Sequence, residues 1–83
     1  MKNIINALTN YGFESRPGHL FAGRGSWTAC GETIKVSFHG DMVTIDHREW
    51  FWDGADTEWE RSTVATCHLS RLWESLPEWV LKR

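Results

Sequence analysis

Six side chains in this sequence belong to the residue types that bind zinc: His19, Cys30, His39, His47, Cys67 and His68. Zinc sites usually pair two ligands about two to four residues apart. The closest pair here, Cys67 and His68, is adjacent, and on a helix its side chains would point about 100° apart. We therefore expect no metal and no other cofactor. Two cysteines are too few for a disulfide framework, so we expect reduced thiols, while a bond between Cys30 and Cys67 stays open.

A nucleophilic active site would combine a serine or cysteine with a histidine and a carboxylate. Histidines and carboxylates of this kind gather near an expected hairpin tip, at His39, Asp41, Asp46 and His47. A hairpin tip is convex and offers no pocket that excludes water, so a solvated turn explains them better. His47 falls on the apolar face of its strand, where Glu49 or a backbone group would satisfy its ring. We therefore expect a protein that is not an enzyme.

The strongest signal for binding is a run of aromatic rings, Trp50, Phe51 and Trp52, at the end of a strand. Strand alternation places Phe51 with the core and both tryptophans on the polar face. Tryptophans on that face either pack under another element or wait for a partner, and the sequence leaves both alternatives open. Two bare rings would form about 300 Å² of aromatic surface, an area typical of functional patches.

Acidic residues surround these rings and complete a candidate binding surface. The expected partner-binding residues are Trp50, Trp52, Trp59, Glu49, Asp53, Asp56, Glu58 and Glu60. The rings would anchor a partner protein and the carboxylates would steer it, so the partner would present a basic groove. The leading interpretation is a small protein-binding module that regulates or inhibits a larger macromolecular complex. A homodimer through the sheet edge or the tryptophan face is also compatible with the sequence.

A second segment suggests a different function. Gly12 and Phe13 end the first expected helix, and residues 16–21, which include His19, come before the strands. This order is similar to the HicA toxin family, small RNA-cleaving domains of α, β, β, β, α order with one histidine entering the first strand. The resemblance makes His19 the catalytic candidate, although the serine expected before that histidine is missing. An RNA site would also need basic residues and a ring gathered on one face, here Arg16, Arg24, Arg48 and Trp27.

The composition describes one folded unit and limits its partners. Eighty-three residues are too few for two cores, so we expect a single domain over residues 1–83. Nine basic and eleven acidic side chains give a net charge of −2, which lacks the basic field that attracts nucleic acids. No apolar run approaches the roughly 20 residues of a bilayer crossing, and the N-terminal residues do not resemble a signal peptide. We expect a cytoplasmic protein without membrane contact.

Local patterns predict the elements that position these residues. Apolar residues at helical spacing predict a short helix over residues 3–11, which Gly12 ends in a left-handed conformation. Strand alternation on both sides of Gly40 and Asp41 predicts a two-residue hairpin. The expected register opposes Phe38 to Val43, Val36 to Ile45, and Lys35 to Asp46.

The second half of the chain is harder to assign. Residues 26–30 have the composition of another strand, and residues 57–63 fit a helix start and a returning strand equally well. A stripe of apolar residues predicts a helix over residues 64–76, followed by a last helical turn after Pro77. The expected fold class is α+β: a short N-terminal helix, an antiparallel meander of three to four strands, and a C-terminal helix packed on one face of the sheet.

Overall fold

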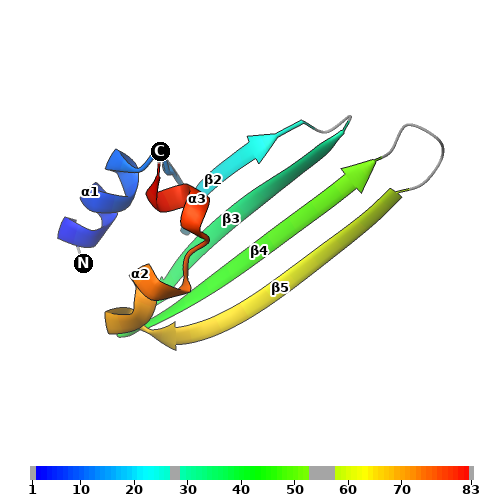
Figure 1. The fold of residues 1–83 in the computed structure, drawn as a ribbon. Helices are drawn as coiled ribbons and strands as arrows, with labels where there is room; N and C mark the ends of the chain where they lie inside the picture. Colours follow the sequence, from blue (N-terminus) through cyan, green and yellow to red (C-terminus); the bar gives the residue numbers. More distant parts are fainter. Residues whose placement is uncertain (1, 27–28, 53–57, 83) are drawn as a thin grey trace.

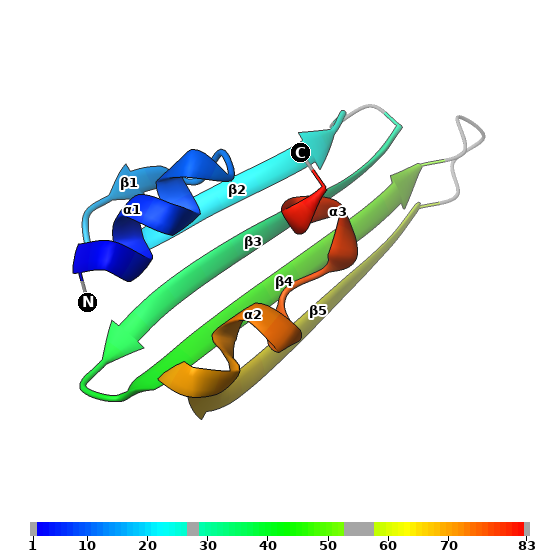
Figure 2. The same ribbon diagram turned by 60° about the vertical axis from the view of Figure 1, so that its left-hand side comes forward.

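The computed structural model describes residues 2–26, 29–52 and 58–82. Its elements are α1 (Lys2–Asn10), β1 (Glu14–Arg16), β2 (His19–Gly25), β3 (Cys30–His39), β4 (Met42–Trp52), β5 (Glu58–His68), the 3₁₀ turn η1 (Leu69–Arg71), α2 (Leu72–Ser75) and α3 (Glu78–Leu81). The strands form one antiparallel sheet in the order β1-β2-β3-β4-β5. The described helices lie on one side of this sheet (Figure 1, Figure 2). The α+β class and the antiparallel meander are therefore confirmed.

The β3–β4 hairpin has the register that the sequence predicts. It joins the expected partners: Phe38 and Val43, Val36 and Ile45, Lys35 and Asp46. Gly40 has a φ of 63°, a left-handed value that glycine adopts without strain in a two-residue loop. Strand alternation then assigns every residue of the sheet to one of two faces. We call the face under the helices the helix-side face and the other the bare face.

The end of α1 also follows its sequence. Gly12 has a φ of 96°, and the N–H of Phe13 donates to the carbonyl of Leu8 at 3.1 Å. This contact folds the chain back, so that Phe13 is buried against the helix it has just left. The direction in which the chain enters β1 is thereby fixed.

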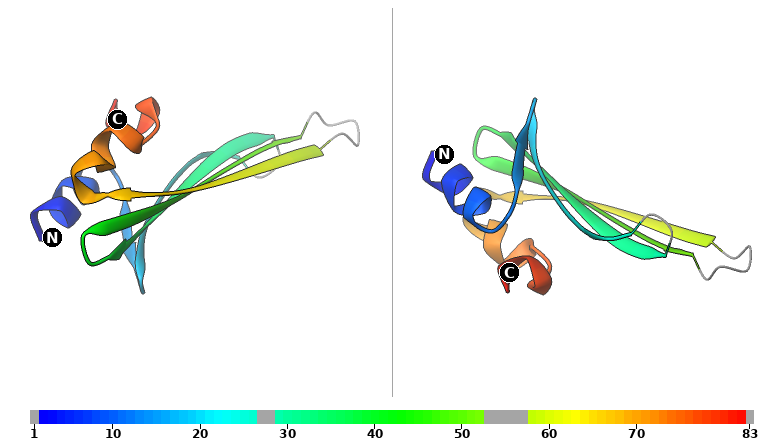
Figure 3. Two further views of the ribbon diagram at one scale, coloured as in Figure 1. Left: turned by 90° about the horizontal axis from the view of Figure 1, so that it is seen from below. Right: turned by 90° about the horizontal axis from the view of Figure 1, so that it is seen from above.

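The core lies between the helices and one half of the sheet. Its buried members are Leu8, Phe13, Leu20, Ala22, Ile34, Val36, Val43, Ile45, Leu72, Leu76 and Val80. The helices cover the half near the β3–β4 hairpin, while the ends of β4 and β5 at Trp52 and Glu58 project beyond them (Figure 3). The molecule is accordingly elongated, with extents of 44 × 24 × 22 Å. None of the described helices has the length and apolarity that crossing a membrane requires.

The structure corrects the prediction for the C-terminal half. The predicted helix over residues 64–76 is wrong for residues 64–68, which continue β5, and helical structure begins only at Leu69. Of the two alternatives for residues 57–63, the described part from Glu58 onward is a strand. The eleven residues of β4 explain both results, because every residue of β5 pairs with them. The apolar stripe that predicted the helix is kept only in its last part, where Leu72 and Leu76 are buried.

The strand count also differs from the prediction. The described sheet has five strands instead of three to four, because the stretch of residues 14–25 contains both β1 and β2. Of residues 26–30, for which the sequence predicts a strand, residues 27 and 28 lie outside the described residues and Cys30 is the first residue of β3. The N–H of Ser26 donates to the carbonyl of Cys30 at 2.9 Å. The neighbour of β3 in the meander is β2.

Candidate functional site

The sheet divides the expected tryptophan surface between its two faces. Trp50 and Trp52 lie on the bare face, as strand alternation predicts. Trp59 pairs with Phe51, so both of these rings lie on the helix-side face. Rings on opposite faces of one sheet cannot contact the same flat partner surface. The three tryptophans therefore belong to two separate surfaces.

The expected acidic rim is divided in the same way. Glu60 pairs with Trp50 and lies on the bare face, while Glu58 pairs with Trp52 in the backbone register. Glu49 lies on the helix-side face, opposite Arg61. The remaining two expected rim residues, Asp53 and Asp56, lie outside the described residues.

Trp50 has a structural contact that the sequence did not reveal. Its indole N–H donates to the carbonyl of Ser26 at 2.8 Å, across the buried residue Gly31. A Cβ added to Gly31 would lie 2.4 Å from a ring carbon of Trp50, so only glycine leaves room for the ring. Trp50 thus holds the connection between β2 and β3 against β4. This explains one of the two tryptophans on the bare face as part of the fold.

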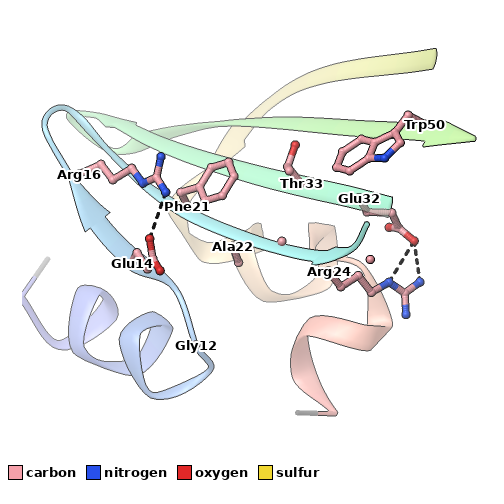
Figure 4. Close-up of a pocket in the computed structure, with 11 residues that line it drawn as sticks. Gly12, Glu14, Arg16, Phe21, Ala22, Arg24, Glu32, Thr33 and Trp50 are labelled. Carbon is pink, nitrogen blue, oxygen red and sulfur yellow. Dashed lines mark hydrogen bonds and ion pairs between the residues drawn. The ribbon is translucent and has the colours of Figure 1, made fainter. Parts of the chain in front are cut away.

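A hollow of about 370 Å³ opens beside Trp50 on the β2 side of the sheet. Figure 4 shows the rings of Phe21 and Trp50 projecting from the same side of the sheet, with Thr33 between them. The guanidinium of Arg16 lies 4.3 Å from the centre of the Phe21 ring. The volume falls within the range of about 300 to 1,000 Å³ that is typical of ligand pockets. Further along β4, Trp52 keeps 44% of its surface exposed.

A polar network lies on the helix-side face, where the cover of the helices ends. Its members are Arg24, Glu32, His47, Glu49, Arg61 and Trp79. Glu32 is its centre: its carboxylate accepts from Arg24 Nη2 at 2.5 Å, and His47 Nε2 lies at 2.9 Å. The indole N–H of Trp79 in α3 donates to the same carboxylate at 2.9 Å. The network therefore ties α3 to the sheet.

A second carboxylate completes the network. Glu49 faces Glu32 in the β3–β4 register, and its Oε1 lies 3.4 Å from His47 Nε2. Each glutamate also holds its own arginine, Arg24 on Glu32 and Arg61 on Glu49. Sequence reasoning correctly expected a polar partner such as Glu49 for His47 but missed Glu32. The predicted register contained the signal, because it places two glutamates opposite each other, and like charges there require cationic partners.

Glu32, His47 and Glu49 are also the one group among the described residues whose ligand atoms could hold a metal ion. These atoms lie within 4.8 Å of one another. Arg24 and Arg61 already neutralise the two carboxylates, so a divalent ion would enter beside two positive charges. A charge-balanced structural tie explains the arrangement without any ion.

The network changes the acidity of Glu32. Burial by itself would raise the pKa of this carboxyl group, but hydrogen bonds from Arg24, His47 and Trp79 outweigh burial and lower it. Because the pKa is lower in the folded protein than in the unfolded chain, the folded state gains stability from the ionised carboxylate. That contribution is complete above the ordinary glutamate pKa and disappears as the pH falls through the lowered value.

We predict that Glu32→Gln removes an acid-sensitive part of the stability. At neutral pH the free energy of unfolding should fall by about 1 to 2 kcal/mol, since charge-assisted hydrogen bonds are lost. At an acid pH below the lowered pKa of Glu32, where the wild-type carboxylate is protonated, the difference between the two proteins should shrink. Urea titrations at both pH values measure this. An unchanged difference at the two pH values would contradict the role given to the ionised carboxylate.

Phe51 and Trp59 form an uncovered aromatic pair on the helix-side face. Their ring centres are 6.3 Å apart at an interplanar angle of 20°, and 38% and 47% of their respective surfaces are exposed. A hollow of about 470 Å³ adjoins them. The sequence placed Phe51 on the correct face, but the helices stop short of it, so it is not a core residue.

The HicA resemblance implies a histidine that enters the first strand, whereas His19 enters the second described strand. His19 begins β2 opposite Arg16, beside a hollow of about 190 Å³. The basic residues needed for RNA do not gather on one face, since Arg24 lies on the helix-side face and Arg48 on the bare face. Trp27 lies outside the described residues.

No protein-family model matches this chain, and comparisons with curated proteins and with solved structures found no match either. The resemblance to the HicA toxins therefore depends on the short segment around His19 alone.

Proposed function

We propose that this protein is a non-catalytic, protein-binding module of the cytoplasm that regulates or inhibits a larger macromolecular complex. One observation carries the proposal: the bare face combines the exposed ring of Trp52 with a preformed hollow between Phe21 and Trp50. None of the described helices covers this face (Figure 1, Figure 2). The two free thiols, Cys30 and Cys67, suit a reducing compartment.

Each part of this surface has a separate role in binding. Trp52 is the anchor, because a large ring that is half exposed can still bury apolar area, and tryptophan is enriched among residues that dominate binding energy. The hollow beside Trp50 accepts a side chain of the partner without rearrangement, since Gly31 and Ser26 already hold its wall. Rigid walls lower the entropy cost of binding.

The charges of the bare face limit the choice of partner. Arg16 is paired with Glu14 and Arg48 with Glu60, so these two arginines do not supply a free basic patch for a nucleic acid. The basic groove that the sequence predicts on the partner gains no support from Glu60, because the ion pair with Arg48 already neutralises this carboxylate. The proposal therefore rests on Trp52 and the hollow, not on an acidic rim.

Trp52→Ala should weaken partner capture while the fold remains intact. We expect the dissociation constant to rise about tenfold or more, as for other central aromatic anchors. The measurement is affinity capture from a lysate of the source organism, followed by titration of the recovered partner with wild type and variant. Trp50→Ala is a poor probe, because Trp50 also packs on Gly31.

Trp59→Ala is the matched control for this experiment. It removes a ring of similar exposure, 47% against 44%, from the opposite face of the sheet. Capture should survive this change. If both variants bind as wild type, or if only the Trp59 variant loses binding, the bare face is not the binding surface.

A further inference from the structure

Within the part of the chain that the structure describes, no strand pairs with the outer edge of β5. This strand is last in the sheet order, and Figure 1 and Figure 2 show it at the free edge. Proteins usually protect such edges with very short strands, bulges, prolines or charged side chains, because an open edge pairs with other chains. The opposite edge, β1, is three residues long. β5 has eleven residues and pairs with β4 without a bulge.

Two charged side chains of β5 that the structure describes, those of Glu60 and Arg61, do not guard the edge either. Glu60 forms an ion pair with Arg48 of β4. Arg61 forms an ion pair with Glu49, which also belongs to β4. Both contacts direct the charge back across the sheet, away from the open edge. The following stretch, residues 62–67, contains no charged residue and no proline.

The hairpin loop determines which backbone groups of β5 point outward. Met42 closes the loop opposite His39, so its N–H points toward β3. Hydrogen-bonding direction alternates along a strand, which turns the odd-numbered residues of β4 and of β5 toward each other. The even-numbered residues of β5, including Ser62 and Val64, therefore direct their N–H and C=O groups to the open edge. Val64 also has 62% of its surface exposed.

We propose that a second copy of this chain pairs with this edge through its own β5, antiparallel, with Thr63 on the two-fold axis. This register uses the full length of both strands and joins two even-numbered residues, Ser62 and Val64, in hydrogen-bonded pairs. It places Glu60 opposite Thr66 and Arg61 opposite Ala65. No two like charges face each other, so electrostatic repulsion does not oppose the pairing.

A second copy fits this edge better than an unrelated strand, because the two ends of the molecule are complementary. Antiparallel pairing places the end of one sheet that its own helices leave uncovered beside the helix-covered end of the other sheet. Trp59 would lie opposite Cys67 of the second copy, next to the start of η1 and α2. Phe51 and Trp59 are exposed because the helices of their own chain stop short of them. The helices of the second copy would flank these rings, which an isolated strand could not do.

The mass in solution tests this dimer. Light scattering after gel filtration, from micromolar to millimolar concentration, should show the wild type approaching twice the monomer mass of 9.6 kDa. Val64→Pro should raise the dimer dissociation constant about a hundredfold, since one outward hydrogen bond is lost from each copy. The fold should persist, because the N–H of Val64 takes no part in the pairing with β4. A wild type that stays monomeric throughout, or a Val64→Pro dimer of unchanged affinity, overturns the proposal.

A cross-link tests the register without relying on proline. In a background with Cys30→Ser and Cys67→Ser, Thr63→Cys places one thiol of each copy at the two-fold axis. Mild oxidation should join these copies rapidly, because opposed residues in a non-hydrogen-bonded pair stand close together. Lys35→Cys, exposed on the bare face and distant from the edge, is the control. Equal cross-linking of the two variants rejects the register with Thr63 at its centre.

The proposed dimer interface and the proposed partner-binding surface can be disproved independently of each other. The interface is the edge of β5, whereas the proposed function depends on Trp52 and the hollow of the bare face. Trp52→Ala should leave the dimer mass in solution unchanged, and the Val64→Pro variant should still capture the partner. Loss of the dimer in both variants would show that the bare face itself forms the self-association surface, contrary to the edge pairing proposed.

Discussion

Leu72→Ala should lower the free energy of unfolding by about 3 kcal/mol, the usual cost of deleting a fully buried leucine side chain. Leu72 is completely buried, and it is the one buried residue of α2. A small domain has a free energy of unfolding on the order of 5 kcal/mol, so the unfolded state should become measurable without denaturant. Urea unfolding followed by circular dichroism gives the difference.

Leu81→Ala is the control for this substitution. It deletes the same atoms from α3, the neighbouring helix, at a position that is 36% exposed. The expected loss is below about 1 kcal/mol, because the side chain already contacts water in the folded state. Similar losses for both variants would mean that Leu72 of α2 does not close the core.

Gly31→Ala should destabilise the protein by about 2 kcal/mol, as overpacking of a filled site usually does. The new methyl group would stand 2.4 Å from a ring carbon of Trp50 and 2.8 Å from the backbone oxygen of Arg24. Trp50 would have to leave the surface of the sheet and lose its hydrogen bond to Ser26. Urea unfolding measures the cost, and the indole N–H resonance of Trp50 reports the displaced ring.

A double-mutant cycle separates the two contacts of this methyl group. In a Trp50→Ala background the ring is absent, so Gly31→Ala should cost at least about 1 kcal/mol less than in the wild type. The residual cost belongs to the contact with Arg24. Additive losses would place Trp50 away from Gly31 and would reopen its role as a free binding residue.

Several elements could be predicted because their signals are local. The hairpin register follows from apolar residues that alternate on both sides of Gly40, since a one-residue slip would turn each of them to the wrong face. The end of α1 follows from Gly12, which adopts the left-handed conformation without strain. The same alternation assigned Trp50, Phe51 and Trp52 to their correct faces. These signals depend on the backbone conformation of a few neighbouring residues.

The candidate site could be predicted less well, because its contacts join distant parts of the chain. The network around Glu32 connects Arg24 in β2 with Trp79 in α3, and no local pattern links residues so far apart. Trp50 owes its packing to Gly31, and a single glycine in the sequence does not indicate which distant ring lies over it. The same residue types are also common on solvated surfaces, so their presence in the sequence does not reveal these contacts.

The sequence by itself determined the fold class, the central hairpin and the face on which each of its rings lies, because backbone geometry imposes these choices locally. Only the tertiary structure decided that residues 58–68 form β5, since strand and helix patterns overlap there and the hydrogen-bonding edge of β4 favours the strand. It also decided how far the helices reach. The helices cover only part of the sheet, so Leu72 is buried while Phe51 and Trp59 stay exposed. Burial depends on which distant segment packs above a residue.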